Sequence, residues 1–339
     1  MSTLSETQVL SRLSSGRVAV IGDLMLDVYL WGQASRISPE APVPVVNVKR
    51  RSCCLGGASN VLRNLRTLGA GAYAFGVVGS DNTARELLDN LNAIGIDAGG
   101  VLIDSSRRTT EKRRIIANGQ QLLRVDIEDA KPVSDALRRK MVDKLIASIR
   151  QGLLDAVIFE DYNKGLLASW MLEEIATEAR KHKVITALDP KPGNLTPVRH
   201  LSVIKPNRAE AFAMAGLTDD GSDAAPEHNP ALLRAAAVLL ESWQPDLLLM
   251  SLAAQGMALF RPALPPEVIP TRAREVFDVS GAGDTVTATY TLAAVAGASA
   301  RVAAELANRA AGVVVGRVGT APISLEELQR ELSAEDKAK

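Results

Sequence analysis

The 339-residue chain is 47% hydrophobic and 23% charged, which is ordinary for a globular protein and excludes a disordered tail protein, a collagen-like rod and a disulfide-stapled miniprotein. Its 39 Lys and Arg balance its 39 Asp and Glu, so the formal net charge is zero. Non-specific nucleic-acid binding needs a basic excess, and we therefore expect no nucleic-acid partner.

Short apolar runs alternate with amphipathic helical patterns along most of the chain. Buried strands are predicted at residues 18–22, 73–78, 156–160, 184–188, 202–204 and 247–251. Helices are predicted between them, among others at residues 135–150, 168–182 and 230–243. This order is typical of an α/β fold with a mostly parallel central sheet and helices on both faces.

Polar residues follow four of the predicted strands. They are Asp23, Asp161, Asp189 and Asn207. Ligands of such sheets bind beyond the carboxyl ends of the strands. We therefore expect these four side chains to line one common edge.

Two segments depart from the alternation and predict a small antiparallel β lid. Residues 43–50 follow a proline-bounded stretch, and residues 110–117 pair naturally with 121–127 across Asn118-Gly119, the strongest short hairpin signal. We expect the lid to comprise roughly residues 35–55 and 108–128. Because an open lid has exposed strand edges, we expect a homodimer that pairs through the lids.

Several features indicate a cytoplasmic protein without a membrane partner. The first 17 residues contain polar and charged side chains and no apolar core of a secretory signal. The longest uncharged run, residues 285–300, is shorter than the ~20 residues that span a bilayer, and its Thr content predicts a buried helix. Cys53 and Cys54 are adjacent and have no other thiol to pair with, which favours a reducing compartment.

The strongest local signal for chemistry is Asp278-Val-Ser-Gly-Ala-Gly-Asp284, which precedes a long helical pattern. Small residues at 280–283 let backbone N–H groups approach an anion, and the positive end of the helix points at the same place. Asp284 is placed to accept a proton from an attacking hydroxyl group, as the general base of phosphoryl transfer does. From spacing alone, a glycine-rich turn with a capping Asp is an equally good interpretation.

The second signal is Leu55-Gly-Gly-Ala-Ser-Asn60, in which Asn60 offers a donor and an acceptor to a polyol. Taken alone, this motif is better interpreted as a turn with an Asn cap. Neither glycine motif is a known nucleotide fingerprint. G-x-x-x-x-G-K-[ST] is absent, and the first strand runs into Gly22-Asp-Leu-Met-Leu-Asp27 rather than G-x-G-x-x-G, which argues against P-loop and dinucleotide-binding folds.

Together the two motifs resemble the signatures of the PfkB/ribokinase family of sugar kinases, in the same order and with a similarly wide separation. The resemblance covers nearly the whole chain and is closest to the branch of D-glycero-β-D-manno-heptose-7-phosphate kinases of lipopolysaccharide-precursor synthesis. The other stretches that carry it are Gly22–Asp27, Arg36-Ile-Ser-Pro-Glu-Ala-Pro-Val-Pro-Val-Val46, Gln120-Gln-Leu-Leu-Arg-Val-Asp126, Asp161-Tyr-Asn-Lys-Gly165, Asp189-Pro-Lys191, Lys205-Pro-Asn207 and Gly312-Val-Val-Val-Gly316. It implies a single ribokinase-like kinase domain over residues 1–339, without the adenylyltransferase domain that many proteins of this branch carry.

The resemblance also assigns roles to individual residues. Asp284 matches the catalytic base, and an anion hole for the transferred phosphoryl group is matched by Gly281, Ala282 and Gly283. Asp27, Gly57 and Asn60 match the family positions that contact the sugar. The element that organises Mg²⁺ and the ATP phosphates through water is matched by Asn207, Arg208, Ala209 and Glu210. Nucleotide contacts are matched by Ser251, Gly256 and, beside the adenine, Asn308, although Ala253 stands where the family often carries glycine. Asp278 matches part of a monovalent-cation site, which implies K⁺.

An acceptor that already carries a phosphate needs fixed cations, for which Arg suits bidentate contacts and Lys a point charge. The candidates in the lid and strand-edge segments are Arg36, Lys112, Arg114, Arg124, Lys164 and Lys191. Most Lys and Arg side chains are simply solvated, which remains the alternative for each of them.

The resemblance implies an ATP-dependent kinase that phosphorylates the anomeric hydroxyl of D-glycero-D-manno-heptose 7-phosphate to the 1,7-bisphosphate, a step of ADP-heptose synthesis. One alternative is a PfkB-family kinase that acts on another sugar phosphate or a nucleoside. A second alternative is a non-catalytic, sugar-sensing binding protein, against which the intact Asp284 argues.

Overall fold

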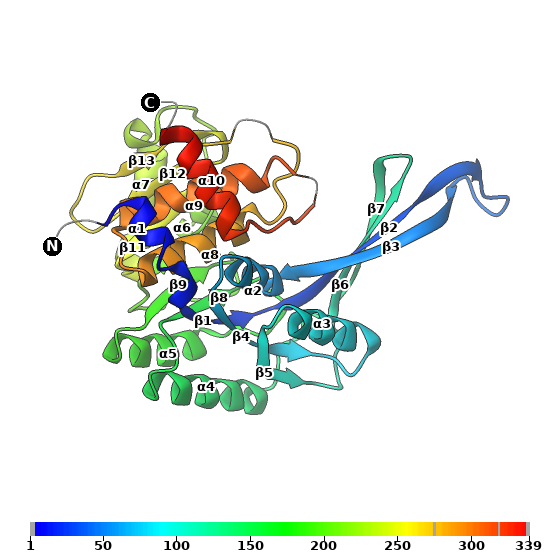
Figure 1. The fold of residues 1–339 in the computed structure, drawn as a ribbon, viewed down its shortest axis with the longest axis horizontal. Helices are drawn as coiled ribbons and strands as arrows, with labels where there is room; N and C mark the ends of the chain where they lie inside the picture. Colours follow the sequence, from blue (N-terminus) through cyan, green and yellow to red (C-terminus); the bar gives the residue numbers. More distant parts are fainter. Residues whose placement is uncertain (1–3, 274–275, 318, 337–339) are drawn as a thin grey trace.

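The computed structural model describes residues 4–273, 276–317 and 319–336. Within them, nine strands form the central sheet in the order β13-β12-β11-β10-β9-β8-β1-β4-β5 (Figure 1). Neighbouring strands from β11 to β5 run parallel, whereas β12 is antiparallel to β11 and β13. The strand bounds are β1 Arg17–Gly22, β4 Gly71–Val78, β5 Asp97–Ile103, β8 Ala156–Glu160, β9 Ile185–Asp189, β10 Val203–Ile204, β11 Leu247–Ser251, β12 Met257–Phe260 and β13 Glu267–Ile269.

Helices cover both faces of this sheet, as predicted. One face is covered by α1 (Glu6–Leu10), α2 (Ala58–Thr67), α3 (Asn82–Ala93), α8 (Ala282–Val295), α9 (Ala300–Val314) and α10 (Leu325–Asp336). The other face is covered by α4 (Asp135–Arg150), α5 (Ser169–Lys181), α6 (Arg208–Ala215) and α7 (Pro230–Trp243). Short 3₁₀ turns lie at Leu13–Ser15, Pro226–His228 and Ala253–Gln255.

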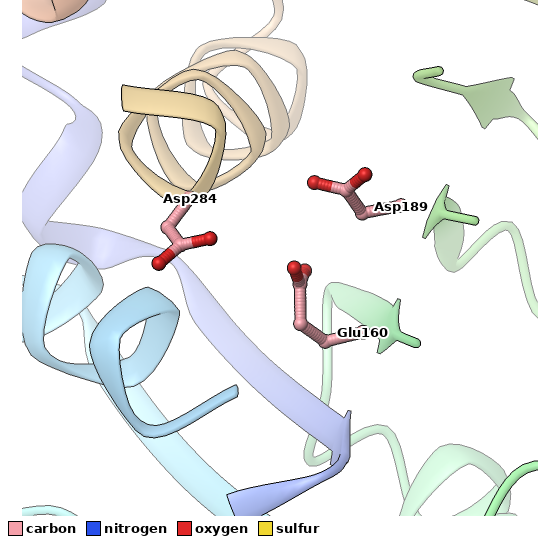
Figure 2. A group of neighbouring side chains, drawn as sticks. All are labelled: Glu160, Asp189 and Asp284. Atoms are coloured by element: carbon pink, nitrogen blue, oxygen red, sulfur yellow. The ribbon is translucent and has the colours of Figure 1, made fainter. Parts of the chain in front are cut away.

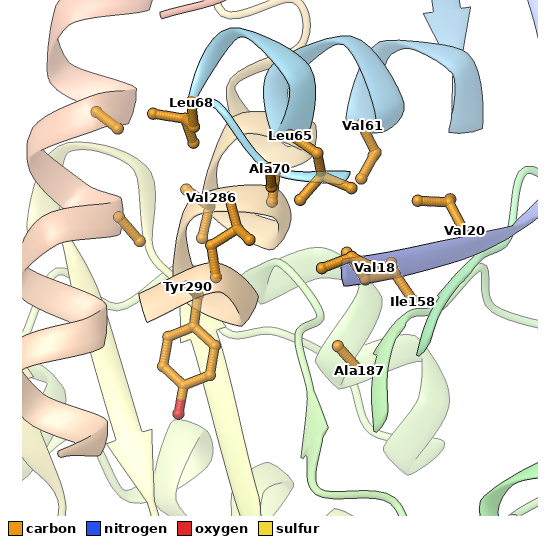
Figure 3. Packing of buried hydrophobic residues seen from close by; sticks show 14 of the residues in the cluster. Val18, Val20, Val61, Leu65, Leu68, Ala70, Ile158, Ala187, Val286 and Tyr290 are labelled. Carbon is orange, nitrogen blue, oxygen red and sulfur yellow. The ribbon is translucent and has the colours of Figure 1, made fainter. Parts of the chain in front are cut away.

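The core lies between the sheet and these helices because successive strand residues point to opposite faces. In β1, Val18 and Val20 belong to one core and Ala19 and Ile21 to the other. Figure 3 shows how α2 and α8 pack together over β1 and β8 in the first of these cores. This packing holds the N-terminal ends of α2 and α8 beside the carboxyl edge of the sheet.

A second sheet, the lid, extends from the body with the strand order β3-β2-β6-β7 (Figure 1). Its strands are β2 Leu24–Ile37, β3 Pro44–Gly57, β6 Thr110–Ala117 and β7 Gln120–Ile127. The β2–β3 and β6–β7 pairs are antiparallel, and the central β2–β6 pair is parallel. At the β6–β7 turn, Asn118 and Gly119 have φ angles of 54° and 81°, and two positive φ angles are what a type I′ hairpin turn requires.

Two features of the structure differ from the sequence expectations. Strand β2 begins at Leu24, well before the predicted lid segment of residues 35–55. Leu24 to Val28 are all buried, so this part of β2 lacks the alternation by which a lid strand is found. The uncharged run 285–300 contains the buried part of α8, but the helix ends at Val295 and α9 begins at Ala300.

Among the helices that the structure describes, none combines the length and the apolar character that crossing a lipid bilayer requires.

Two threonines of α8 allow a matched test of this core. The buried Thr289 hydroxyl has no hydrogen-bond partner in the described part of the chain, whereas the Thr285 hydroxyl bonds to Asn64 Oδ1 at 3.2 Å. Thr289→Val, which keeps the shape, should raise the free energy of unfolding by about 1 kcal/mol by removing a desolvated polar group. Thr285→Val should lower it by about 1–2 kcal/mol because it removes the hydroxyl that lies within hydrogen-bonding distance of Asn64 Oδ1 and the carbonyl oxygen of Gly281. Urea unfolding measures both, and a Thr289→Val variant less stable than the wild type would contradict the assignment.

Candidate active site

A cavity of about 820 Å³ opens at the carboxyl edge of the central sheet. Its walls come from the segments that follow β8, β9, β10 and β11, from the first turn of α8 and from α9. Asp161, Asp189 and Asn207 line it, as the positions after their strands predict. Asp23 is the exception, because its side chain is buried outside the cavity lining.

Asp284 lies in the first turn of α8, at the wall of the cavity, with 6% of its surface exposed. Asn60 Nδ2 donates a hydrogen bond to its Oδ2 at 2.6 Å, and the Tyr162 hydroxyl donates to its Oδ1 at 2.7 Å. Burial raises the pKa of Asp284, and these two hydrogen bonds oppose the rise. A buried carboxylate with a raised pKa and fixed orientation is suited to accept a proton near neutral pH.

The glycine-rich turn before Asp284 brings the backbone close to this carboxylate. Gly281, the N-cap of α8, has a φ angle of 79°, and a Cβ there would lie 2.8 Å from Asn60 Nδ2. Gly281, Ala282 and Gly283 all line the cavity. The first N–H groups of a helix have no partner within the helix, so such a turn can offer donors to an anion. In this structure the N–H of Ala282 donates to the carbonyl oxygen of Val279 at 3.2 Å.

Three carboxyl groups converge below this turn (Figure 2). Oxygens of Glu160, Asp189 and Asp284 lie within 4.8 Å of one another. Lys205 Nζ contacts Asp189 Oδ2 at 2.8 Å, and both residues line the cavity. Burial, with repulsion from Asp189 and Asp284, raises the pKa of Glu160 well above its ordinary value. The raised pKa favours the neutral form of Glu160, and the ammonium of Lys205 offsets a further negative charge in the cluster.

Asn207 and Glu210 stand at the start of α6, where each caps the other. Asn207 Oδ1 accepts the N–H of Glu210, and Glu210 Oε2 accepts the N–H of Asn207, both at 2.9 Å. Lys191 Nζ donates to Glu210 Oε1 at 3.2 Å. Arg208 lines the cavity and pairs with Asp219 at 2.7 Å. Carboxylate and amide oxygens are the ligand types that Mg²⁺ prefers, so Asn207 and Glu210 fit the ion that the sequence implies.

The other nucleotide candidates lie in the same cavity. Ala209, Ser251, Gly256 and Asn308 all line it. Ser251 is bridged to Asn207 across the sheet edge. Asn308 Nδ2 donates to the carbonyl oxygen of Pro270 at 2.6 Å, which fixes its amide against the chain that follows β13.

Asp27 and Gly57 lie at the base of the lid. Asp27 is buried in β2, and Arg114 Nη1 donates to its Oδ1 at 2.6 Å. Gly57 ends β3 and is the N-cap of α2, so Asn60 follows in the first turn of that helix. Neither Asp27 nor Gly57 lines the large cavity, so the residues predicted to contact sugar lie on the lid side of Asp284.

The basic residues that are candidates for binding the phosphate of the acceptor lie in different parts of the structure. Lys112, Arg124 and Lys164 come together around two carboxylates, with Asp126 bonded to Lys112 and Arg124 and Glu128 bonded to Lys112 and Lys164. Lys112 pairs in register with Asp27 of the neighbouring strand. Of the other three candidates, Arg114 is bonded to Asp27, Arg36 is exposed near the end of β2, and Lys191 is on the cavity side with Glu210.

Asp278 is held by the backbone on both sides. Its Oδ1 accepts the N–H of Ser280 at 2.9 Å and its Oδ2 accepts the N–H of Gly319 at 3.0 Å. Burial opposes ionisation, but these hydrogen bonds lower the pKa of Asp278. An ionised carboxylate at this position is compatible with the predicted cation contact.

Three residues of the site have no assigned role in the sequence motifs: Glu160, Tyr162 and Lys205. The contact of Arg114, a candidate for the acceptor's phosphate, with Asp27 is also not predicted. Tyr162 and Lys205 follow predicted strands at the carboxyl edge, a position that is itself a signal. Glu160 ends an apolar run and cannot be distinguished from a strand residue by pattern. Arg114 requires the pairing of β6 with β2, which no local pattern predicts.

Comparisons with known proteins identify a family and a fold. The profile of the pfkB family carbohydrate kinases matches residues 15–328. Proteins named bifunctional protein HldE are similar to the chain, with 43% identity over 92% of it in Helicobacter pylori, 43% over 95% in Desulfatibacillum aliphaticivorans and 39% over 97% in Pelobacter propionicus. The chain spans 65%, 64% and 65% of the length of these relatives, respectively.

Solved structures share the fold at low identity. Ribokinase from Arabidopsis thaliana, complexed with ribose and ATP, has a TM-score of 0.71 and 20% identity, over 94% of this chain and 99% of that one. Phosphofructokinase-2 from Escherichia coli, in complex with potassium, has a TM-score of 0.72 and 15% identity, over 95% and 99%. These likenesses confirm the expected ribokinase-like fold.

The hydrogen bond from Tyr162 to Asp284 can be tested by titration. Tyr162→Phe removes one donor from the ionised carboxylate, so the pKa of Asp284 should rise further above its ordinary value. NMR of protein with ¹³C-labelled aspartate carboxyl groups follows the titration, and the Asp284→Asn variant identifies the signal. A pKa of Asp284 that is unchanged or lower in Tyr162→Phe would contradict this contact.

Proposed function

The chain belongs to the pfkB family of carbohydrate kinases, and from this premise we propose that it transfers the γ-phosphoryl group of ATP to the anomeric hydroxyl of D-glycero-D-manno-heptose 7-phosphate. The product would be the 1,7-bisphosphate, a precursor in ADP-heptose and lipopolysaccharide core synthesis. We propose a cytoplasmic location, where ATP is available.

The observation that carries the proposal is the position of Asp284. It lies between the large cavity, which holds the nucleotide candidates, and the base of the lid, which holds the sugar candidates Asp27 and Asn60. A base that removes a proton from a sugar hydroxyl beside the terminal phosphate of ATP has to occupy this boundary.

In the proposed mechanism Asp284 accepts the proton of the acceptor hydroxyl while Tyr162 and Asn60 hold its two oxygens. Backbone N–H groups of Gly281 and Gly283 stabilise the charge on the transferred phosphoryl group, and that of Ala282 would join them by giving up its bond to the carbonyl oxygen of Val279. The Lys205 ammonium lies 3.5 Å from the position of a Cβ on Gly283 and adds a fixed positive charge there. Asn207 and Glu210 would hold Mg²⁺ through water, and this ion supplies charge neutralisation of the ATP phosphates. Asp278 would contact K⁺.

The acceptor is proposed from the resemblance to the heptose-phosphate branch and from the lid. Lys112, Arg124 and Lys164, together with Arg114 beside Asp27, make a basic group on the sugar side of the base. An acceptor that carries a phosphate at the end remote from its reacting hydroxyl would place this phosphate there. The nearest alternative remains a family member that uses another sugar phosphate or a nucleoside.

We also propose a homodimer that forms through the lids. The edge strands β3 and β7 are unpaired on their outer sides within the described lid. On β7, the side chains of Leu123 and Val125 are 54% and 38% exposed. An exposed strand edge with apolar side chains is stabilised by pairing with another chain.

Replacing the proposed base separates catalysis from binding. Asp284→Asn keeps the size of the side chain but cannot accept the proton, so kcat should fall by about 10²–10⁴-fold. ATP binding, measured by calorimetry, should stay within about twofold because the cavity walls are kept. Equal thermal midpoints would show that the variant is folded. Unchanged turnover would mean that the base is misassigned, and a wild type that binds sugar but never produces ADP would favour the sugar-sensing protein.

The acceptor can be identified with a panel in a coupled ADP assay. Heptose 7-phosphate should give the highest kcat/KM, and heptose without the phosphate should lose about 10²-fold or more, because each hydrogen bond to a charged group contributes about 1.5–3 kcal/mol. Lys164→Ala should raise KM for the sugar phosphate and leave KM for ATP unchanged. Lys140→Ala, on the exposed surface of α4, is the matched control. A preference for fructose 6-phosphate or a nucleoside would overturn the acceptor.

A further inference from the structure

Asp23 is a buried carboxylate at the carboxyl edge of the sheet that does not line the cavity and has no role in the proposed chemistry. It follows β1, and 6% of its surface is exposed. Its Oδ2 accepts two backbone hydrogen bonds, from Tyr162 N–H at 2.9 Å and from Lys164 N–H at 3.1 Å. The side chain of Asp23 therefore fixes the loop after β8, which carries the Tyr162 hydroxyl to Asp284.

The backbone of Asp23 fixes the other donor of the base. Its carbonyl oxygen accepts the N–H of Ala58, the first residue of α2, at 3.2 Å. Gly57, directly before it, has a φ angle of 53°, and a Cβ there would lie 2.8 Å from this oxygen. Glycine at this position lets the start of α2 approach Asp23 closely, and Asn60 follows in the same helical turn.

We propose that Asp23 is a positioning residue that holds in place the two hydrogen-bond donors of Asp284, Tyr162 through its carboxylate and Asn60 through its carbonyl oxygen. The inference rests on the proposed role of Asp284 as the base. It assigns to Asp23 the orientation of that base, without contact with either substrate.

The charges around Asp23 make the contact with the Tyr162 loop sensitive to pH. Burial and, to a smaller extent, the nearby Asp161 raise the pKa of Asp23, whereas the two backbone hydrogen bonds and Arg107 lower it, and the net result is a pKa of about 6. Arg107 also donates to the carbonyl oxygen of Lys164 at 2.6 Å, so it holds the same loop. Above about pH 6 the carboxylate makes charge-assisted hydrogen bonds, which are weakened when it is protonated.

The effect of this titration on stability has the opposite sign. In the unfolded chain Asp23 has its ordinary pKa of about 3.9, so between about pH 6 and pH 4 the folded state binds a proton that the unfolded state does not. The contribution of Asp23 to the free energy of unfolding therefore rises as the pH falls through this range. Loosening of the Tyr162 loop on acidification is thus distinct from unfolding.

The first test is a double-mutant cycle on kcat. Asp23→Ala should lower kcat by about 10–100-fold through misplacement of the Tyr162 loop, with KM for ATP within about twofold. Asp23→Asn keeps an acceptor oxygen and should lose less. If Asp23 acts through Tyr162, the loss in Asp23→Ala/Tyr162→Phe should be at least about threefold smaller than the product of the two single losses. Losses that multiply independently would overturn the proposal.

Asp155→Ala is the matched control. Asp155 is also a carboxylate beside β1, but it bonds to Arg17 at the opposite end of the strand. This variant should lower the thermal midpoint and leave kcat unchanged. A fall in kcat equal to that of Asp23→Ala would show that any weakening of β1 suffices, and would also overturn the proposal.

Hydrogen exchange tests the positioning without turnover. The amides of Tyr162 and Lys164 should be protected at neutral pH, lose protection below about pH 6 after correction for intrinsic rates, and exchange fast in Asp23→Ala. In Asp23→Asn the change near pH 6 should be absent. Unprotected amides in the wild type would refute the role of Asp23. A wild type that phosphorylates no acceptor but shows this exchange pattern would refute the proposed function instead.

Discussion

The site depends on one buried carboxylate that is held from two sides. Asp284 is fixed by Asn60 from α2 and by Tyr162 from the loop after β8, and these residues are 224 and 122 positions away in sequence. Removing a carboxylate from water is costly unless its oxygens receive hydrogen bonds. Asp284 can therefore be buried only if α2, α8 and the loop after β8 come together around it. The packing of α2 against α8 over the sheet brings them together.

The second constraint is charge. Three carboxyl groups within 4.8 Å of one another would repel an incoming triphosphate if all were ionised. Lys205 neutralises one charge through Asp189, and the raised pKa of Glu160 removes another. Both effects reduce the negative charge that an incoming triphosphate meets beside the first turn of α8. The carboxylate of Asp284 and the proposed anion-binding N–H groups all belong to the N-cap and first turn of α8.

The sequence predicts the elements whose pattern is local. The predicted bounds of α4, α7, β6, β8 and β11 agree with the structure, because each has a clear hydrophobic period or a turn signal at its ends. The Asp278–Asp284 motif predicts its turn and helix for the same reason. Contacts that depend on distant pairing are not predicted: β2 is buried on both faces near the body, and Arg114 reaches Asp27 only through the β2–β6 pair. Asp23 shows that a residue that follows a strand at the carboxyl edge does not always line the ligand cavity. Its side chain can instead turn inward and accept hydrogen bonds from the backbone.

Two lid strands, β2 and β3, join the surroundings of the proposed base without an intervening loop, and motif residues lie at these junctions. Strand β2 starts one residue after Asp23, and β3 ends at Gly57, directly before α2. Of the four lid strands, β2 and β3 therefore adjoin the residues that supply a donor to Asp284 or hold one in place: β2 follows Asp23, and β3 leads into α2, which carries Asn60. A displacement of the lid base shifts Asp23 or the first turn of α2, because a short rigid connection transmits movement that a flexible loop would absorb. In this fold the groups that would enclose a sugar and the groups that would orient the base are parts of the same continuous chain segments.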